Sequence, residues 1–159
     1  DILPRVALSR KDRLWEHTCF EAFISAPALK RYYELNMSPA KEWAVYHFND
    51  YREGMTPEYR LTDVEAKVSL AIEKGALLNK TATLRYEFGF DVASLQTLRI
   101  GLGSIQNLQL GLTAVIEMRD HSKTYWALKH TGDRADFHQR ASFILQMHDG
   151  LAEVEQGDS

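Results

Sequence analysis

Two glutamates, Glu21 and Glu34, are the residues of this 159-residue chain with the clearest potential for chemistry. Each lies inside a segment of otherwise apolar and aromatic residues, where an unpaired polar group costs roughly 1–3 kcal/mol. Two carboxyls that face each other are the arrangement of glycosidases, in which one carboxyl has a raised pKa and acts as general acid. The alternative is a closed network in which both carboxylates accept hydrogen bonds from neighbouring strands.

Cys19 and His17 are a second candidate, as nucleophile and base. Residues two apart on a strand are separated by about 6.6 Å along the chain. A working dyad needs hydrogen-bond contact, at about 3 Å. We therefore expect Cys19 to be a buried, unreactive core residue, and we predict no catalytic residue in the chain.

A third group, near the C-terminus, contains His130, Asp133, Asp136 and His138. Its spacing matches no zinc signature, so we predict no metal site. Asp136, His138 and Arg140 alternate, and a strand would place all three on one face. We interpret them as an ion-paired surface row, with a catalytic row as the alternative.

Aromatic side chains are interleaved with these polar residues. Flat rings are common platforms for ring-shaped ligands such as sugars, and a few polar groups fix the ligand's orientation. The alternative is that the rings only fill a core and no cavity exists. We predict a ligand-binding cleft formed by His17, Glu21, Glu34, Asn36, Trp43, Trp126 and His130.

The elements that must position these residues are short segments in which apolar and polar residues alternate, the period of a β-strand. Residues 62–73 also fit a helical face, but their long alternation favours a strand. Asp91 can cap one short helix over 91–98. Strands are expected over 14–24, 31–38, 42–48, 62–73, 83–90, 107–118, 124–130 and 137–147.

This pattern predicts an all-β fold: a two-sheet antiparallel β-sandwich, jelly-roll-like, with at most one or two short helices. We expect one domain over residues 1–150, followed by a flexible polar tail over 151–159. The predicted core includes Phe20, Phe23, Leu35, Val45, Leu112, Ile116 and Leu128.

Composition excludes several classes of partner. The net charge of -3 provides no basic surface for nucleic acid or for an anionic membrane. No apolar run approaches the roughly 20 residues that span a bilayer. Cys19 is the single cysteine, so an internal disulfide is impossible and a reducing compartment is favoured. We therefore expect a cytoplasmic protein.

Several segments resemble a known family. They are LWEHTCFEAF, YYELNMSPAKEWAVYHF, YREGM, GLTAVIE, SKTYWALKH and ADFHQRASF, in that order between Leu14 and Phe143. They resemble the DOMON-like ligand-binding domains, specifically an uncharacterised bacterial subgroup related to the family-nine carbohydrate-binding modules.

This resemblance implies a β-sandwich that binds a carbohydrate or another small ring-bearing metabolite without catalysis. Some relatives bind haem through a Met and a His, but no such pair can be assigned here, so the cofactor stays unknown. A haem-binding sensor or electron-transfer domain and a sugar-acting hydrolase are the alternative functions.

The resemblance also bears on the N-terminal edge of the fold. Related sequences carry further strand-forming residues before the segment that begins at Leu14, whereas thirteen residues precede Leu14 here. We expect either a shortened chain or a missing edge strand. A missing edge would expose an unpaired strand that could join two copies in a homodimer.

Overall fold

The computed structural model describes residues 8–61, 64–74, 80–90, 108–148 and 151–154. These residues form eleven strands and two 3-10 helices of three residues each, and they contain no α-helix. The predicted all-β fold is therefore confirmed. The expected helix over 91–98 lies outside the described residues.

The main sheet has nine strands in the described residues, and it does not close into a barrel. Its order is β1-β4-β3-β2-β8-β10-β11, with β5 paired to β4 and β9 paired to β8. The members are β1 (Ser9–Arg10), β2 (Cys19–Ser25), β3 (Tyr32–Met37), β4 (Glu42–Phe48), β5 (Thr56–Pro57), β8 (Leu108–Glu117), β9 (Lys123–Ala127), β10 (Leu145–His148) and β11 (Leu151–Val154). The pairing is antiparallel except between β1 and β4, which are parallel, so the sheet is mixed.

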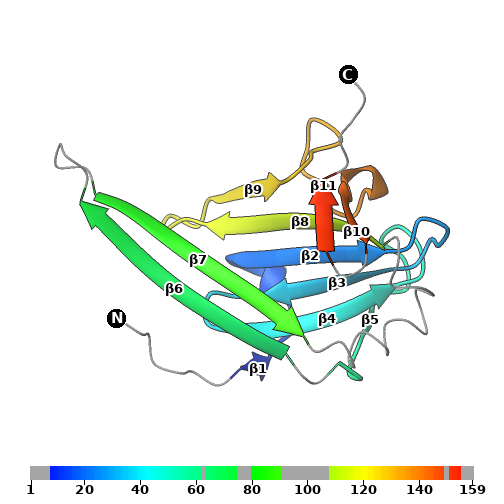
Figure 1. Cartoon of the computed structure of the whole chain (residues 1–159), viewed down its shortest axis with the longest axis horizontal. Coiled ribbons are helices and arrows are strands. Elements are labelled where there is room, and N and C mark those ends of the chain that lie inside the picture. The colour runs from blue at the N-terminus through cyan, green and yellow to red at the C-terminus, as the bar shows by residue number, and fades with distance from the viewer. Residues whose placement is uncertain (1–7, 62–63, 75–79, 91–107, 149–150, 155–159) are drawn as a thin grey trace.

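A second sheet consists of the hairpin β6 (Val64–Lys74) and β7 (Lys80–Phe90). The segment with the ambiguous pattern is thus a strand, as expected. In Figure 1 this hairpin, drawn in green, runs diagonally across the view in front of the main sheet.

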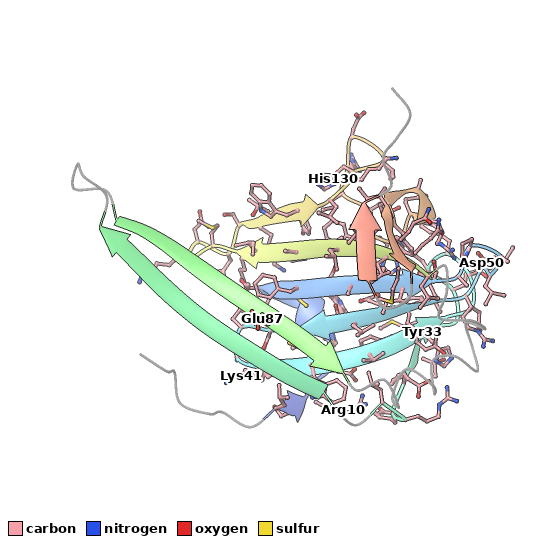
Figure 2. The ribbon with its side chains drawn as sticks, in the orientation of Figure 1. Arg10, Tyr33, Lys41, Asp50, Glu87 and His130 are labelled. Atoms are coloured by element: carbon pink, nitrogen blue, oxygen red, sulfur yellow. The ribbon has the colours of Figure 1, made fainter. Side chains whose placement is uncertain are left out.

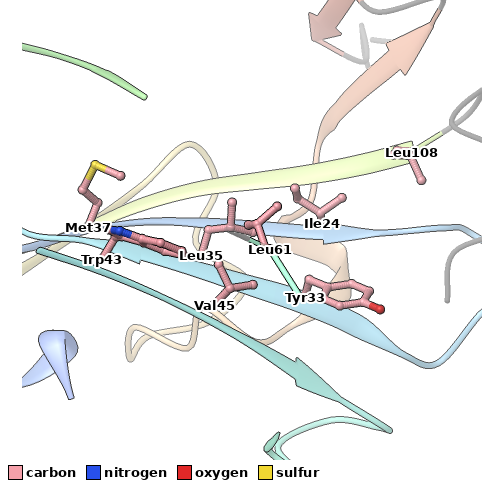
Figure 3. Close-up of a cluster of buried hydrophobic side chains, with 8 residues drawn as sticks. All are labelled: Ile24, Tyr33, Leu35, Met37, Trp43, Val45, Leu61 and Leu108. Atoms are coloured by element: carbon pink, nitrogen blue, oxygen red, sulfur yellow. The ribbon is translucent and has the colours of Figure 1, made fainter. Parts of the chain in front are cut away.

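Strand alternation gives the main sheet two apolar faces. One face, here called the core face, carries a buried cluster around Tyr33, Leu35 and Val45 (Figure 3). The other face carries a second cluster around Phe23, Tyr32 and Phe48. Glu21, Glu34, Tyr46 and Thr113 share that second face through the strand register, and we call it the pocket face. The central strands are therefore buried on both sides, which explains their near-continuous runs of large residues.

The structure corrects two of the expected strands. Leu14–Glu16 forms the 3-10 helix η1 instead of the start of β2, after Arg13 adopts a left-handed conformation with φ 62°. Between residues 137 and 147, a turn and the 3-10 helix η2 (Arg140–Ser142) precede the short strand β10. The expected tail also begins with a strand, because β11 pairs with β10.

The predicted core is correct at its centre and wrong at one edge. Phe23, Leu35 and Val45 are buried. Phe20 and Ile116 are half-buried, and Leu112 and Leu128 are exposed. Leu112 and Leu128 are neighbours, since the Leu128 amide donates to the Leu112 carbonyl oxygen. They lie toward the β9 edge of the sheet, beyond the cluster that covers the middle of the core face.

Candidate functional site

A pocket of about 420 Å³ lies on the pocket face of the main sheet. Strands β2, β3 and β8 supply its floor, and η1, β9 and two loops supply its walls. The lining residues are Trp15, Glu21, Glu34, Phe48, Arg52, Met55, Val115, Tyr125, Ala135, Phe137 and His138.

Glu21 and Glu34 lie at the floor and are 6% and 4% exposed. Glu21 pairs with Asn36 across β2 and β3, and Glu34 precedes Asn36 by two positions on the same face. The two glutamates are therefore diagonal neighbours, with backbones about 7–8 Å apart. Their side chains both line the same cavity.

Each carboxyl has one oxygen held by the protein. The Thr113 hydroxyl donates to Oε2 of Glu21 at 2.9 Å, and the Asn36 amide donates to Oε1 of Glu34 at 2.6 Å. Cys19 completes the arrangement, because its Sγ lies 3.5 Å from Oδ1 of Asn36 and orients that amide. Asn36 thus holds Glu34 in place on the pocket face without itself lining the pocket.

Burial raises the pKa of both carboxyls to about 7. The charge of Glu34 adds to the increase at Glu21, whereas the hydrogen bonds from Thr113 and Asn36 oppose the increase at their respective carboxyls. The floor therefore exchanges protons near neutral pH, unlike ordinary surface glutamates.

Arg52 and Asp136 form an ion pair in the wall of the pocket, with 2.9 Å between Nη2 and Oδ1. Tyr51 and Gln139 also donate hydrogen bonds to Asp136. Although burial opposes the effect, these hydrogen bonds lower the pKa of Asp136 to about 2. The pair stays charged at neutral pH. Asp136 offsets the charge of the Arg52 guanidinium, which still lowers the pKa of both glutamates at the floor of the pocket.

His138 faces the floor, with its Nε2 3.8 Å from Oε2 of Glu34. Burial is the main cause that lowers the pKa of His138 to about 4, so the ring is neutral at pH 7 and forms no ion pair there. Its Nδ1 lies 2.7 Å from the Tyr32 hydroxyl, which accepts a hydrogen bond from the Arg52 amide. Tyr32 therefore connects the two loop residues of the wall.

Aromatic rings form the rest of the wall. Trp15 on η1 packs edge-on against Tyr46, with 5.4 Å between ring centroids. Tyr125 on β9 lies 6.2 Å from Phe137, and it is half exposed. These rings offer apolar surfaces beside the polar floor, the combination that binds ring-shaped ligands.

The structure separates the two predicted tryptophans from the rest of the expected cleft. Trp43 packs in the core-face cluster (Figure 3), and Trp126 is 63% exposed. Trp43 is paired with Met37, and Trp126 with Ala114, which puts both on the core face. The prediction that they form the stacking surface beside Glu21 is wrong in its geometry, because side chains alternate along a strand.

The two predicted histidines lie outside the pocket lining. His17 is exposed, and its Nδ1 lies 2.7 Å from Oε2 of Glu117. His130 is exposed beyond the end of β9 (Figure 2), with its ring 6.3 Å from that of Phe137. His130 therefore lies near a wall residue, and His17 does not contribute to the floor.

The expected row of Asp136, His138 and Arg140 is also divided, because these residues occupy a turn and η2 rather than a strand. Arg140 donates to the carbonyl oxygens of Ala26 and Leu29, away from the pocket. His138 and Arg52 join the site from loops, which have no periodic pattern to indicate their direction. Tyr125 was detectable, because it alternates with Trp126 on a predicted strand.

The described residues contain no group of three or more His, Cys, Asp or Glu side chains placed to hold a metal ion. They also contain no helix long and apolar enough to cross a membrane. Met37 on β3 packs in the core-face cluster (Figure 3).

Comparison with known proteins supports the fold. No protein family description and no curated protein sequence matches the chain. A solved structure from Bacteroides uniformis, described as a putative carbohydrate-binding protein, superposes with a TM-score of 0.59 at 20% sequence identity. The match covers 87% of this chain but 64% of that protein, so this chain spans less than two thirds of its length. At this identity the likeness establishes a shared all-β fold, of a kind found in a protein described as carbohydrate-binding.

Proposed function

We propose that this protein is a non-catalytic binding module whose pocket holds a sugar or a similar small ring. The observation that carries the proposal is the composition of the pocket: two buried carboxyls at its floor beside the rings of Trp15, Tyr125 and Phe137. Carboxyls accept hydrogen bonds from ligand hydroxyls, and flat rings cover the apolar faces of a sugar. The cavity volume lies within the range of ordinary small-molecule sites.

Two further observations support the proposal. The structural neighbour from Bacteroides uniformis is described as carbohydrate-binding, and it shares the fold. The segments that resemble DOMON-like domains contain β2, β3 and most of β8, which supply the floor, and β9, which supplies one wall. We propose on this basis that the chain is a DOMON-like domain, a ligand-binding relative of the carbohydrate-binding modules.

A pair of adjacent aromatic residues provides the test. Tyr125 and Trp126 follow each other on β9 and are both exposed, but Tyr125 lines the pocket and Trp126 points to the core face. With a sugar ligand found by glycan-array screening, Tyr125→Ala should weaken binding at least about tenfold, since it removes a stacking surface. Trp126→Ala should leave the affinity unchanged.

The affinities should be measured by isothermal titration calorimetry, and circular dichroism should verify that both variants are folded. Equal losses in the two variants would place the binding site elsewhere. If no sugar bound to the protein, the proposed function would be contradicted.

A sugar hydrolase is a second candidate, favoured by the two carboxyls in one cavity. Such enzymes need one protonated acid and one ionised carboxylate at the same pH. Here burial raises both pKa values to about 7, so the environment does not separate the two roles. If the protein released sugars from oligosaccharides and Glu21→Gln abolished this release, hydrolysis would be supported. If the protein released no sugar, binding alone would be favoured.

A further inference from the structure

The negative charge that Glu21 and Glu34 carry when ionised is not balanced by a cation at the floor of the pocket. Glu21 and Glu34 each use one carboxyl oxygen in a hydrogen bond to a neutral side chain. Within the described part of the chain, neither carboxyl has a Lys or Arg partner at ion-pair distance. Two buried carboxyls without a cation between them are costly, because burial and mutual repulsion both oppose ionisation.

The charged and titratable groups around the floor do not supply that cation. Arg52 is paired with Asp136; its charge lowers the pKa of both carboxyls, but it forms no ion pair with either. His138 is neutral at pH 7 and hydrogen-bonded to Tyr32. Cys19 is an uncharged thiol held at Asn36. The wall thus contributes little net positive charge, while the floor carries two acids that open onto the cavity.

The geometry suits a small cationic group. Glu21 and Glu34 are diagonal neighbours on one face, and their second oxygens have no hydrogen-bond partner among the described residues. An ammonium group has three donors and a full positive charge, and it can contact both carboxylates at once. A sugar hydroxyl can satisfy the hydrogen bonds but cannot neutralise the charge.

We propose that the ligand of this pocket is an amino sugar whose protonated amine binds between Glu21 and Glu34, beside the rings of Trp15 and Tyr125. This inference rests on the proposed sugar-binding function and further specifies that the ligand carries a positive charge. It predicts selectivity for an amine over a hydroxyl at one position of an otherwise identical sugar.

The test uses matched sugars. Glucose and glucosamine, galactose and galactosamine, and mannose and mannosamine differ by one hydroxyl-to-amine exchange, and N-acetylation of each amino sugar removes the charge. In at least one pair, the amine should bind at least about tenfold more tightly than the hydroxyl form, and acetylation should remove the difference. Binding should release protons in calorimetry with buffers of different ionisation enthalpy, because the cation favours the ionised carboxylates.

Isosteric variants locate the effect. Glu21→Gln and Glu34→Gln keep an acceptor for Thr113 and for Asn36 but remove a charge, and each should weaken amine binding about tenfold more than it weakens binding of the matched neutral sugar. Glu42→Gln is the control, since Glu42 pairs with Lys11 and does not line the pocket. Melting temperatures should verify that the variants are folded.

The outcomes separate the two proposals. Equal affinity for amine and hydroxyl forms, with both weakened by Tyr125→Ala, would overturn the amine inference and leave sugar binding intact. Amine selectivity that survives both glutamine variants would also overturn it. Absence of binding to every sugar would overturn both proposals.

Discussion

At the scale of single residues, the protein keeps two glutamates where burial opposes their ionisation. Glu34 is 4% exposed, and the hydrogen bond from Asn36 offsets part of the cost of burying it. A buried group of this kind makes stability depend on pH, because the folded and unfolded states hold the proton with different affinity. Glu34 is therefore a direct probe of the pocket's electrostatics even before a ligand is identified.

We predict that Glu34→Gln stabilises the protein increasingly as pH rises. The folded pKa of Glu34, about 7, exceeds its ordinary value of 4.5. The native state therefore binds the proton more tightly, and this stabilisation is complete below pH 4.5 and is lost as pH rises through 7. Relative to the wild type, the variant should gain roughly 1–3 kcal/mol in unfolding free energy between about pH 4.5 and about pH 8.

Urea denaturation at several pH values measures this difference. His138 has the opposite dependence, because its lowered pKa makes it stabilising above its ordinary value of 6.5 and destabilising as pH falls toward 4. Above about pH 7 the His138 ring is neutral in the folded and unfolded states of both proteins, so the change in that range comes from the carboxyls. Parallel stability curves for the two proteins would show that the pKa of Glu34 is not raised.

At the scale of the elements, strand β8 depends on a glycine to receive an aromatic ring. Gly111 pairs with Phe23 on the pocket face. The Phe23 ring stacks on Phe143, with 5.5 Å between centroids. A Cβ at Gly111 would lie 2.8 Å from Cδ1 of Phe143, which is closer than packed carbons approach. The absence of a side chain on β8 thus lets the segment after η2 close over the sheet.

Gly111→Ala should therefore destabilise the protein by roughly 1–3 kcal/mol, because the buried Phe143 ring must move. Gly132→Ala is the matched control, since a Cβ there meets no atom within 4 Å. Differential scanning calorimetry of both variants makes the comparison. An unchanged melting temperature for Gly111→Ala would contradict the described packing between β8 and Phe143.

At the scale of the whole molecule, the main sheet is a continuous layer with apolar clusters on both faces. Cys19 lies in β2, between β3 and β8, and is 0% exposed. The predicted burial of this thiol is confirmed. Burial raises its pKa, so both access and ionisation oppose its reaction in the native state.

Cys19 should consequently react with a thiol reagent only when the sheet opens. We predict labelling more than about 100-fold slower than that of free cysteine, with a rate that rises in urea as unfolding becomes frequent. Lys129→Cys, in an exposed loop, provides a rapidly labelled control in the same protein. Native Cys19 that reacts as fast as this control would contradict the described burial.

The sequence by itself determined the class of fold and the strands that carry the floor of the site. Alternation over 31–38 and 42–48 reproduces β3 and β4, because the period of two follows from the pleat of any extended chain. The same local rule singled out Glu21 and Glu34, since polar residues inside apolar strands need a partner. Both residues line the pocket.

The tertiary structure alone decided which other residues join them. Alternation divides a strand into two faces but does not say which face holds a cavity, so Trp43 and Trp126 were expected beside Glu21 and lie on the core face. Arg52 and His138 come from loops, whose direction depends on contacts with distant residues such as Tyr32. Local periodicity fixes the neighbours on a strand, whereas long-range packing chooses the face and closes the pocket.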